Sequence, residues 1–335
     1  MIRGCPIIVP GSSRIVPMPR SFFILLVLLA LSSACASPNR AAPLVDRLSS
    51  IPGDADKQTP ETDLHPPSAG PGWSQPVPLQ GPINTAGAED SPFLPADGRE
   101  LYFFFTPDVR VPVERQLLDQ VTGIYVSQWT GSGWGEPERV RLTKGNELSM
   151  DGCEFVLGDE MWFCSARAGN HNEIDWYIAK RVDGGWSDWK NAGLPINGGF
   201  QVGELHLTLD GQEMYFGSAR PGGYGGLDLW VSTRTSDGWG QPANLGPQVN
   251  TAFNDGWPYV SPDGTELWYS SHYSIYRCLR QPDGSWIDCK QIISAISGEP
   301  TLSPDGKTLY FVHHYLDSNQ QIIEADIYVS QRLEP

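Results

Sequence analysis

The chain has 335 residues, and its 40% of hydrophobic residues can fill the core of one large domain or two smaller ones. The formal net charge of −16 excludes a nucleic-acid backbone as partner and disfavours electrostatic docking on anionic lipid, because both need a basic surface. Frequent glycine (36), proline (29) and tryptophan (12) favour many short strands joined by tight turns over helices.

The N-terminus carries an export signal. Arg20 precedes an apolar run at residues 22–31, and small residues lead from this run to Cys35. The run is too short to span a membrane, so residues 1–35 are interpreted as a secretory signal peptide. Met18 is a more typical start than the first methionine, which suggests that residues 1–17 are a misassigned extension.

The end of this signal, "LSSAC", resembles the lipobox of bacterial lipoproteins, with Ser32 where that box usually has leucine. The resemblance implies that Cys35 is lipidated and that Ala36 after it sends the protein to the outer membrane. An ordinary signal peptide with an incidental cysteine is the alternative. Residues 36–71 are rich in Pro, Ala, Ser and Asp without periodicity, so we expect a flexible tether before a folded domain at 72–335.

Within this domain one hairpin pattern recurs five times, each copy with a turn between strands rich in aromatic and β-branched residues. The copies lie at 92–104, 154–164, 205–217, 256–271 and 300–312. A third strand follows each of them, at 123–129, 175–181, 228–234, 274–280 and 326–332. A fourth element with Gly-Trp or Gly-Ser-Trp follows the first four, at 133–137, 185–189, 238–242 and 284–289. Four strands per repeat, with a period of about 50 residues, predict a β-propeller.

The fifth repeat lacks its own fourth strand, and the segment "GWSQPVPL" at 72–79 can supply it. A ring closed in this way leaves no free sheet edge. We therefore predict an all-β fold: a single five-bladed β-propeller of four-stranded antiparallel blades, closed by an N-terminal strand that completes the last blade.

The repeats, with turns such as "SPDG" at 261–264 and 303–306, resemble the TolB-like, WD-like β-propeller repeats of bacterial envelope proteins. The resemblance covers residues 72–335 and implies an envelope protein of the propeller fold. It specifies function poorly, because propellers serve as lectins, hydrolases, peptidase gates and scaffolds.

Four cysteines of the domain face one another in pairs. A two-residue turn places Cys153 across from Cys164, and another places Cys278 across from Cys289. In an exported protein these pairs predict two disulfides within hairpins, with buried free thiols as the alternative. Zinc binding is disfavoured, because neither pair has CxxC spacing or a nearby histidine.

Charged residues gather at one predicted face of the ring. The segments entering the first strands carry acids in every repeat, namely Glu89, Asp90, Asp151, Glu204, Asp255 and Glu299. The second strands end on the same face with Arg167, Arg220, His272 and His314. These ten residues are candidate ligand-binding residues at a channel mouth. The alternative is structural: the arginines would pair with Asp175 and Asp228, and the acids would cap turns or bind water.

Acids held close together in a channel repel one another, so at least one should have a raised pKa unless a cation compensates. Hard oxygen ligands suit Ca²⁺ better than zinc, so we expect Ca²⁺ or a basic partner segment at the mouth. Asp255 and Glu299 are the expected contributors, because His272 and His314 lie in the same two repeats.

No nucleophile elbow, HExxH, Walker or Rossmann motif occurs in the sequence. The favoured hypothesis is a non-catalytic binding or scaffold propeller, an outer-membrane lipoprotein facing the periplasm that binds an envelope protein or a ligand at the channel mouth. It would be a monomer held at the membrane only by its lipid. The alternatives are a glycan-binding or glycoside-hydrolysing propeller with axial carboxylates, which aromatic platforms beside the acids would favour, and a purely structural lipoprotein.

Overall fold

The computed structural model describes residues 46–142, 147–194, 196–200 and 202–334, and the predicted export signal and Cys35 lie outside them. The described chain is all-β, with antiparallel sheets and two short helical turns. These turns are η1 (Leu48–Ser50) and α1 (Val113–Gln116).

Strands pair antiparallel in chain order within each predicted repeat. The first repeat contains β3 (Ala88–Phe93), β4 (Glu100–Thr106), β5 (Gly123–Gln128) and β6 (Glu138–Arg139). The second contains β7 (Ser149–Leu157), β8 (Glu160–Arg167), β9 (Asp175–Val182) and β10 (Gly185–Asn191). The third contains β11 (Leu205–Leu207), β12 (Glu213–Ser218), β13 (Asp228–Thr235), β14 (Gly238–Trp239) and β15 (Ala243–Asn244), with both β14 and β15 on β13.

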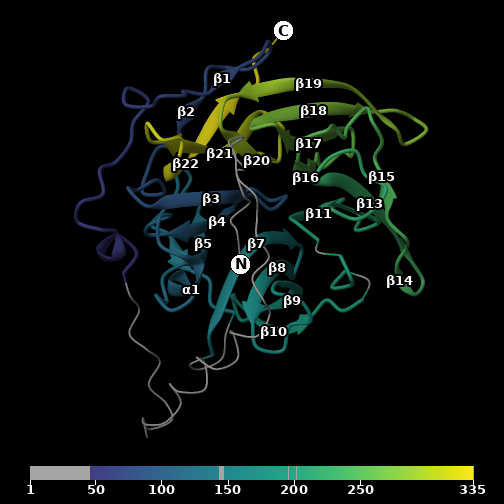
Figure 1. Ribbon diagram of the computed structural model, residues 1–335, viewed down its shortest axis with the longest axis horizontal. Helices are drawn as coiled ribbons and strands as arrows, with labels where there is room; N and C mark the ends of the chain where they lie inside the picture. Colours follow the sequence, from purple (N-terminus) through teal and green to yellow (C-terminus); the bar gives the residue numbers. More distant parts are fainter. Residues whose placement is uncertain (1–45, 143–146, 195, 201, 335) are drawn as a thin grey trace, which may run out of the picture.

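The next group contains β16 (Asp255–Val260), β17 (Glu266–Ser271), β18 (Ser274–Arg280) and β19 (Trp286–Ser294). The last contains β20 (Ser297–Leu302), β21 (Thr308–Leu316) and β22 (Ile322–Gln331). Figure 1 shows these groups following one another around a common centre, with the first strand of each group innermost.

The two ends of the domain meet at β22. The N-terminal strand β2 (Val77–Pro78) pairs antiparallel with β22, with Val77 opposite Val329. Trp73 forms a further bridge to Arg332, and its buried ring lies edge-on against Trp268 with centroids 5.4 Å apart. The segment at 72–79 therefore occupies the fourth-strand position that the sequence predicts for it.

The N-terminal segment, residues 46–71, differs from the expected flexible tether, because it lies against the domain. Its strand β1 (Ser68–Ala69) pairs with β19. Lys57 donates hydrogen bonds to the buried carboxylates of Glu324 and Asp326, and the Asp63 carboxylate lies 2.7 Å from Nε2 of buried His313. The pairing of β1, the positive charge of Lys57 beside two acids and the contact of Asp63 with His313 hold this proline-rich segment in place.

Both expected disulfides are present. Cys153 is bonded to Cys164 across β7 and β8, and Cys278 is bonded to Cys289 across β18 and β19. Each bond links residues 11 apart in sequence, so each closes a hairpin of one sheet.

Four of the five first strands, all but β11, share a β-bulge that determines which side chains face the centre. The register shifts after Asp90 in β3, after Gly152 in β7, after Gly256 in β16 and after Gly298 in β20. The next residue in each strand has a left-handed backbone although it is not glycine, with φ between 51° and 56°: Ser91, Cys153, Trp257 and Glu299. A bulge re-aims side chains and adds strain, and such strain is typical of binding sites.

Candidate functional site

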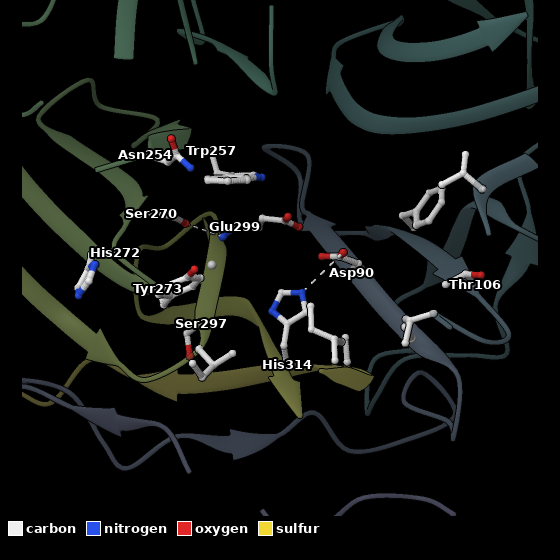
Figure 2. A pocket seen from close by; sticks show the side chains of 18 of the residues that line it. Asp90, Thr106, Asn254, Trp257, Ser270, His272, Tyr273, Ser297, Glu299 and His314 are labelled. Carbon is white, nitrogen blue, oxygen red and sulfur yellow. Dashed lines mark hydrogen bonds and ion pairs between the residues drawn. The ribbon is translucent and has the colours of Figure 1, made fainter. Parts of the chain in front are cut away.

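A cavity of about 760 Å³ opens on the face where the first strands begin and the second strands end. Its walls are largely apolar and aromatic, with Phe104, Val109, Met150, Phe253, Trp257 and Tyr273 among them. Figure 2 shows Asp90, Glu299 and His314 close together in this cavity. A second, narrow space of about 40 Å³ adjoins this cavity, and Trp257 and Glu299 line both spaces. These two residues therefore mark the inner end of the large cavity.

The inner end of the cavity holds an acidic cluster that we define as Asp90, Glu204, Glu299 and Glu154. Ser91 joins three of its members: its backbone N–H donates to Asp90 Oδ1 (2.8 Å) and Glu299 Oε2 (2.6 Å), and its hydroxyl donates to Glu204 Oε1 (3.2 Å). The backbone N–H of Glu299 donates to the Ser270 hydroxyl. The bulge therefore provides the donors that hold these carboxyl groups together.

The carboxyl groups of the cluster differ in protonation. Burial and the negative charges of Asp90 and Glu204 raise the pKa of Glu299 well above its usual value. Burial likewise raises the pKa of Asp90, but the interactions of its carboxylate with His314 and Glu299 outweigh it and place that pKa below its usual value. Asp90 is therefore the ionised member of the pair, and burial favours the protonated form of Glu299. Burial and the charge of Asp90 raise the pKa of Glu204 to about 8, so this group is also largely neutral at pH 7.

Glu154 is a member of the cluster that the sequence did not reveal. Its side chain is 5% exposed, and neither carboxyl oxygen has a hydrogen-bond partner within the described residues. It faces the same narrow space as Glu204 and Glu299, and burial raises its pKa well above the usual value. A buried polar group without a hydrogen-bond partner is costly, and the cost is smaller for the neutral acid that the raised pKa favours.

Aromatic rings close the channel below the cluster. Phe93, Phe155, His206 and Tyr259 lie in neighbouring repeats, with successive ring centroids 4.7 to 4.9 Å apart. Burial lowers the pKa of His206 to about 3, so its ring is neutral and packs like the others. The spaces above and below these rings measure only about 40 and 60 Å³. The large cavity is therefore a closed-ended pocket.

Three predicted site acids, Glu89, Asp151 and Asp255, do not line this pocket, which corrects the expectation that all five repeats contribute equivalent acids. Glu89 accepts hydrogen bonds from Thr85 and Arg47. Asp151 binds Arg167, and Asp255 accepts from Thr251. The physical reason is the bulge. These acids lie opposite Phe105, Ser165 and Ser271 before the register shift, whereas Glu299 occupies the bulge itself.

The two predicted arginines serve different contacts. Arg167 pairs with Asp151 at 2.6 Å rather than with Asp175, which corrects the structural alternative for this residue. Arg220 donates to the Ser218 hydroxyl and lies over the rings of Phe216 and Trp230. Neither arginine lines the pocket.

Both predicted histidines line the pocket. His314 Nε2 lies 3.9 Å from Asp90 Oδ2, and His272 packs on Phe253 with ring centroids 4.1 Å apart. The sequence missed Trp257 and Tyr273, although the Gly-Trp-Pro at 256–258 matches the Gly-Glu-Pro at 298–300 and could have revealed Trp257.

Within the described ranges, no group of three or more His, Cys, Asp or Glu side chains is arranged to hold a metal ion. This geometry does not support the expected Ca²⁺ site. In the part of the chain that the structure describes, no helix is long and apolar enough to cross a membrane.

No family model and no curated relative matches the sequence. The fold is similar to that of TolB from Agrobacterium tumefaciens, at 16% identity over 74% of this chain and 84% of that one, with a TM-score of 0.40. A periplasmic gluconolactonase from Pseudomonas aeruginosa matches at 13% identity over 73% of both chains, with a TM-score of 0.39. An α-L-arabinofuranosidase from Lactobacillus brevis matches at 13% identity over 75% of this chain and 92% of that one, with a TM-score of 0.43. At these values the likenesses carry no argument about what this chain does.

Proposed function

We propose that this chain is an exported, non-catalytic binding propeller that takes an organic ligand in the cavity at its channel mouth. We infer that the groups of paired strands are five blades, and that β2 closes the ring on β22. One observation carries the proposal: the closed-ended cavity of about 760 Å³, with apolar walls and a few polar groups at its inner end. Ligand sites typically have this size and composition.

The spacing of Asp90 and Glu299 argues against inverting glycoside hydrolysis by this pair. Asp90 Oδ1 and Glu299 Oε2 both accept from the backbone N–H of Ser91, at 2.8 and 2.6 Å, so these two oxygens lie no farther apart than the sum of the two distances. Inverting enzymes need carboxyl groups about 6.5–9.5 Å apart, so that a water fits beside the sugar.

Glycan binding without hydrolysis is the second candidate function. Aromatic rings beside the acids favour it, because Trp257, Tyr273 and Phe253 line the same cavity as Asp90 and Glu299. A sugar would stack on these rings and donate hydroxyl hydrogen bonds to the carboxyl groups.

Export is supported by the two disulfides, which persist in oxidising compartments. In this proposal Cys35 carries the lipid anchor at the outer membrane. Stable anchoring needs more than one acyl chain, and a lipidated Cys35 would carry them. Cys35→Ser removes this anchor, so the variant should move from the membrane fraction to the soluble periplasm. A variant that still sediments with membranes would count against lipidation.

The binding function can be tested by filling the cavity. Ala252 lies at its exposed rim, so Ala252→Trp should block entry without removing a polar group. Ala243→Trp, on the exposed outer strand β15, is the matched control. The probes are tryptamine, tryptophol, indole-3-acetate and chitotriose, measured by thermal shift on the full chain.

At least one probe should raise the melting temperature of the wild type and the control, and none should raise that of Ala252→Trp. Chitotriose as the strongest probe would select the glycan candidate. Equal shifts for Ala252→Trp and wild type, or no shift for any probe, would refute the proposed binding site.

A further inference from the structure

The cavity has two chemically different ends. Its inner end presents Asp90, Glu299 and His314, and its walls present aromatic and aliphatic side chains. A ligand that fits must therefore place a polar group at the inner end and an apolar body against the walls. The polar group is what defines the ligand class.

The inner end offers acceptors and little positive charge. Asp90 is ionised, and its second oxygen, Oδ2, lies 3.9 Å from His314, which is longer than a hydrogen bond. Below it, both oxygens of buried Glu154 lack any donor within the described residues. Arg110 also lines the cavity, but it is bonded to Asp108 and is half exposed. These observations call for a group that donates a hydrogen bond to Asp90.

The charge of the cluster sets the charge of that group. Asp90 is ionised, whereas the pKa of Glu204 is raised to about 8 and burial favours the protonated forms of Glu299 and Glu154. One ionised carboxylate balances one positive charge. A divalent cation would need a second carboxylate to lose its proton in a buried place, and an anion would be repelled.

The walls suit the same kind of ligand. Trp257, Tyr273, Phe253 and Phe104 line the cavity, and aromatic rings attract cations that lie over their faces. An ammonium group has three donors and no acceptor, which matches a site made of carboxyl oxygens.

We propose that the ligand of this cavity is an organic cation, with one ammonium group beside Asp90 and Glu299 and an apolar or aromatic body against Trp257, Tyr273 and Phe104. This inference rests on the proposed function, and it names the class of ligand. The ammonium group is carried by a free small molecule or by a lysine side chain next to apolar residues of a partner, and these two sources share one chemistry.

Three probes with one body separate charge from shape: tryptamine, tryptophol and indole-3-acetate carry an ammonium, a hydroxyl and a carboxylate on the same indole. Isothermal titration calorimetry with the full chain should give at least about tenfold tighter binding for tryptamine than for tryptophol, and no binding for indole-3-acetate. Tryptamine binding should also release protons, because its charge lowers the pKa values of the cluster. The titratable and charged groups that face it are Asp90, Glu204, Glu299, Glu154, His314, His272 and Arg110.

Asp90→Asn tests the residue that carries the charge. This variant keeps the shape and the acceptor for the Ser91 N–H, so it should lose the preference for tryptamine and retain tryptophol binding. Retained tryptophol binding and an unchanged melting temperature show that the variant is folded. Asp97→Asn, in an exposed turn of the same hairpin, is the control and should behave like the wild type.

Equal affinities for tryptamine and tryptophol, or an unchanged preference in Asp90→Asn, would overturn the cation assignment and leave the cavity as a binding site. Binding of none of the three indoles would also overturn it, whereas the proposed function fails only if chitotriose does not bind either or if Ala252→Trp responds to the probes like the wild type. If a capped Gly-Trp-Lys-Gly peptide binds more tightly than tryptamine, the ammonium group comes from a lysine of a partner. If tryptamine binds more tightly, it comes from a free amine.

Discussion

Arg47→Met would remove a buried cation that joins the N-terminal segment to the first repeat. The guanidinium donates to the carbonyls of Pro82 (2.5 Å) and Ile83 (2.8 Å) and to Glu89 Oε1 (3.2 Å). It also lies over the rings of Phe105 and Phe103, 5.2 and 5.7 Å from their centroids. Arg47 is 6% exposed and Glu89 is fully buried, so water cannot easily replace these contacts.

The expected cost follows from the groups that are left behind. Two carbonyls lose this donor at about 1–3 kcal/mol each, so the variant should lose about 2–6 kcal/mol of unfolding free energy at pH 7. The loss should grow at higher pH. Burial raises the pKa of Glu89 to about 8 even with Arg47 beside it. Above that pH Glu89 is ionised and needs its partner, and breaking a buried ion pair costs about 3–5 kcal/mol.

Thermal and urea unfolding of the full chain at about pH 7 and about pH 9 measures this effect. At about 2–4 °C per kcal/mol, Arg47→Met should melt roughly 4–24 °C below the wild type. Arg110→Met is the matched control: Arg110 is 53% exposed on its ion pair with Asp108, so its loss should cost no more than about 1 kcal/mol. If Arg47→Met unfolds like the wild type at both pH values, the N-terminal segment is a loose tether and the reasoning fails.

Three further predictions concern the fold and the site. Trp73→Ala should lower the free energy of unfolding by about 3–5 kcal/mol, because the Trp73 ring is 5% exposed and packs on Trp268. Trp129→Ala is the control and should lower it much less, because that ring is 47% exposed. Equal urea midpoints for the two variants would contradict ring closure through this segment. Glu204 binds its proton more tightly in the folded than in the unfolded chain, because burial raises its pKa from 4.5 to about 8. Its contribution to the free energy of unfolding is therefore full below about pH 4.5 and is lost as the pH rises through 8. Glu204→Gln should unfold with a weaker pH dependence over that range, and parallel stability profiles of the variant and the wild type would refute this. Cys153→Ser and Cys278→Ser should each cost about 2–3 kcal/mol, the low range for short loops, and no loss in unfolding assays would mean that the bonds do not form.

The strand pairing within repeats could be predicted because its signals are local. Turn residues between alternating aromatic and β-branched residues define each hairpin, and the Cys153–Cys164 and Cys278–Cys289 bonds follow from hairpin register. The pairing of β2 with β22 could be predicted because the last repeat lacked one element.

The membership of the site could be predicted only in part, because it depends on the bulges. A register shift of one residue decides which side chains face the centre. Asp90, Glu204 and Glu299 were therefore identified together with Glu89, Asp151 and Asp255, which turn to other partners. The prolines at 92, 258 and 300 each follow a bulge residue and are the sequence signal of this shift.

The contacts of the N-terminal segment, residues 46–71, could not be predicted for a different reason. Its composition lacks the periodicity of a strand or helix, and composition alone predicts a flexible tether. Its contacts are single charges that meet partners far away in sequence, such as Lys57 with Glu324 and Asp63 with His313. Such long-range pairs leave no local pattern to recognise.

A crystal structure of the full chain with 5-bromotryptamine would show whether the cavity binds an organic cation through Asp90. The bromine gives an anomalous signal that locates the indole independently of the rest of the density. We expect this signal among Phe104, Trp257 and Tyr273, with the ammonium within about 3 Å of Asp90. A bromine signal only outside this cavity, or an ammonium turned away from Asp90 toward solvent, would show that Asp90 does not bind the cation.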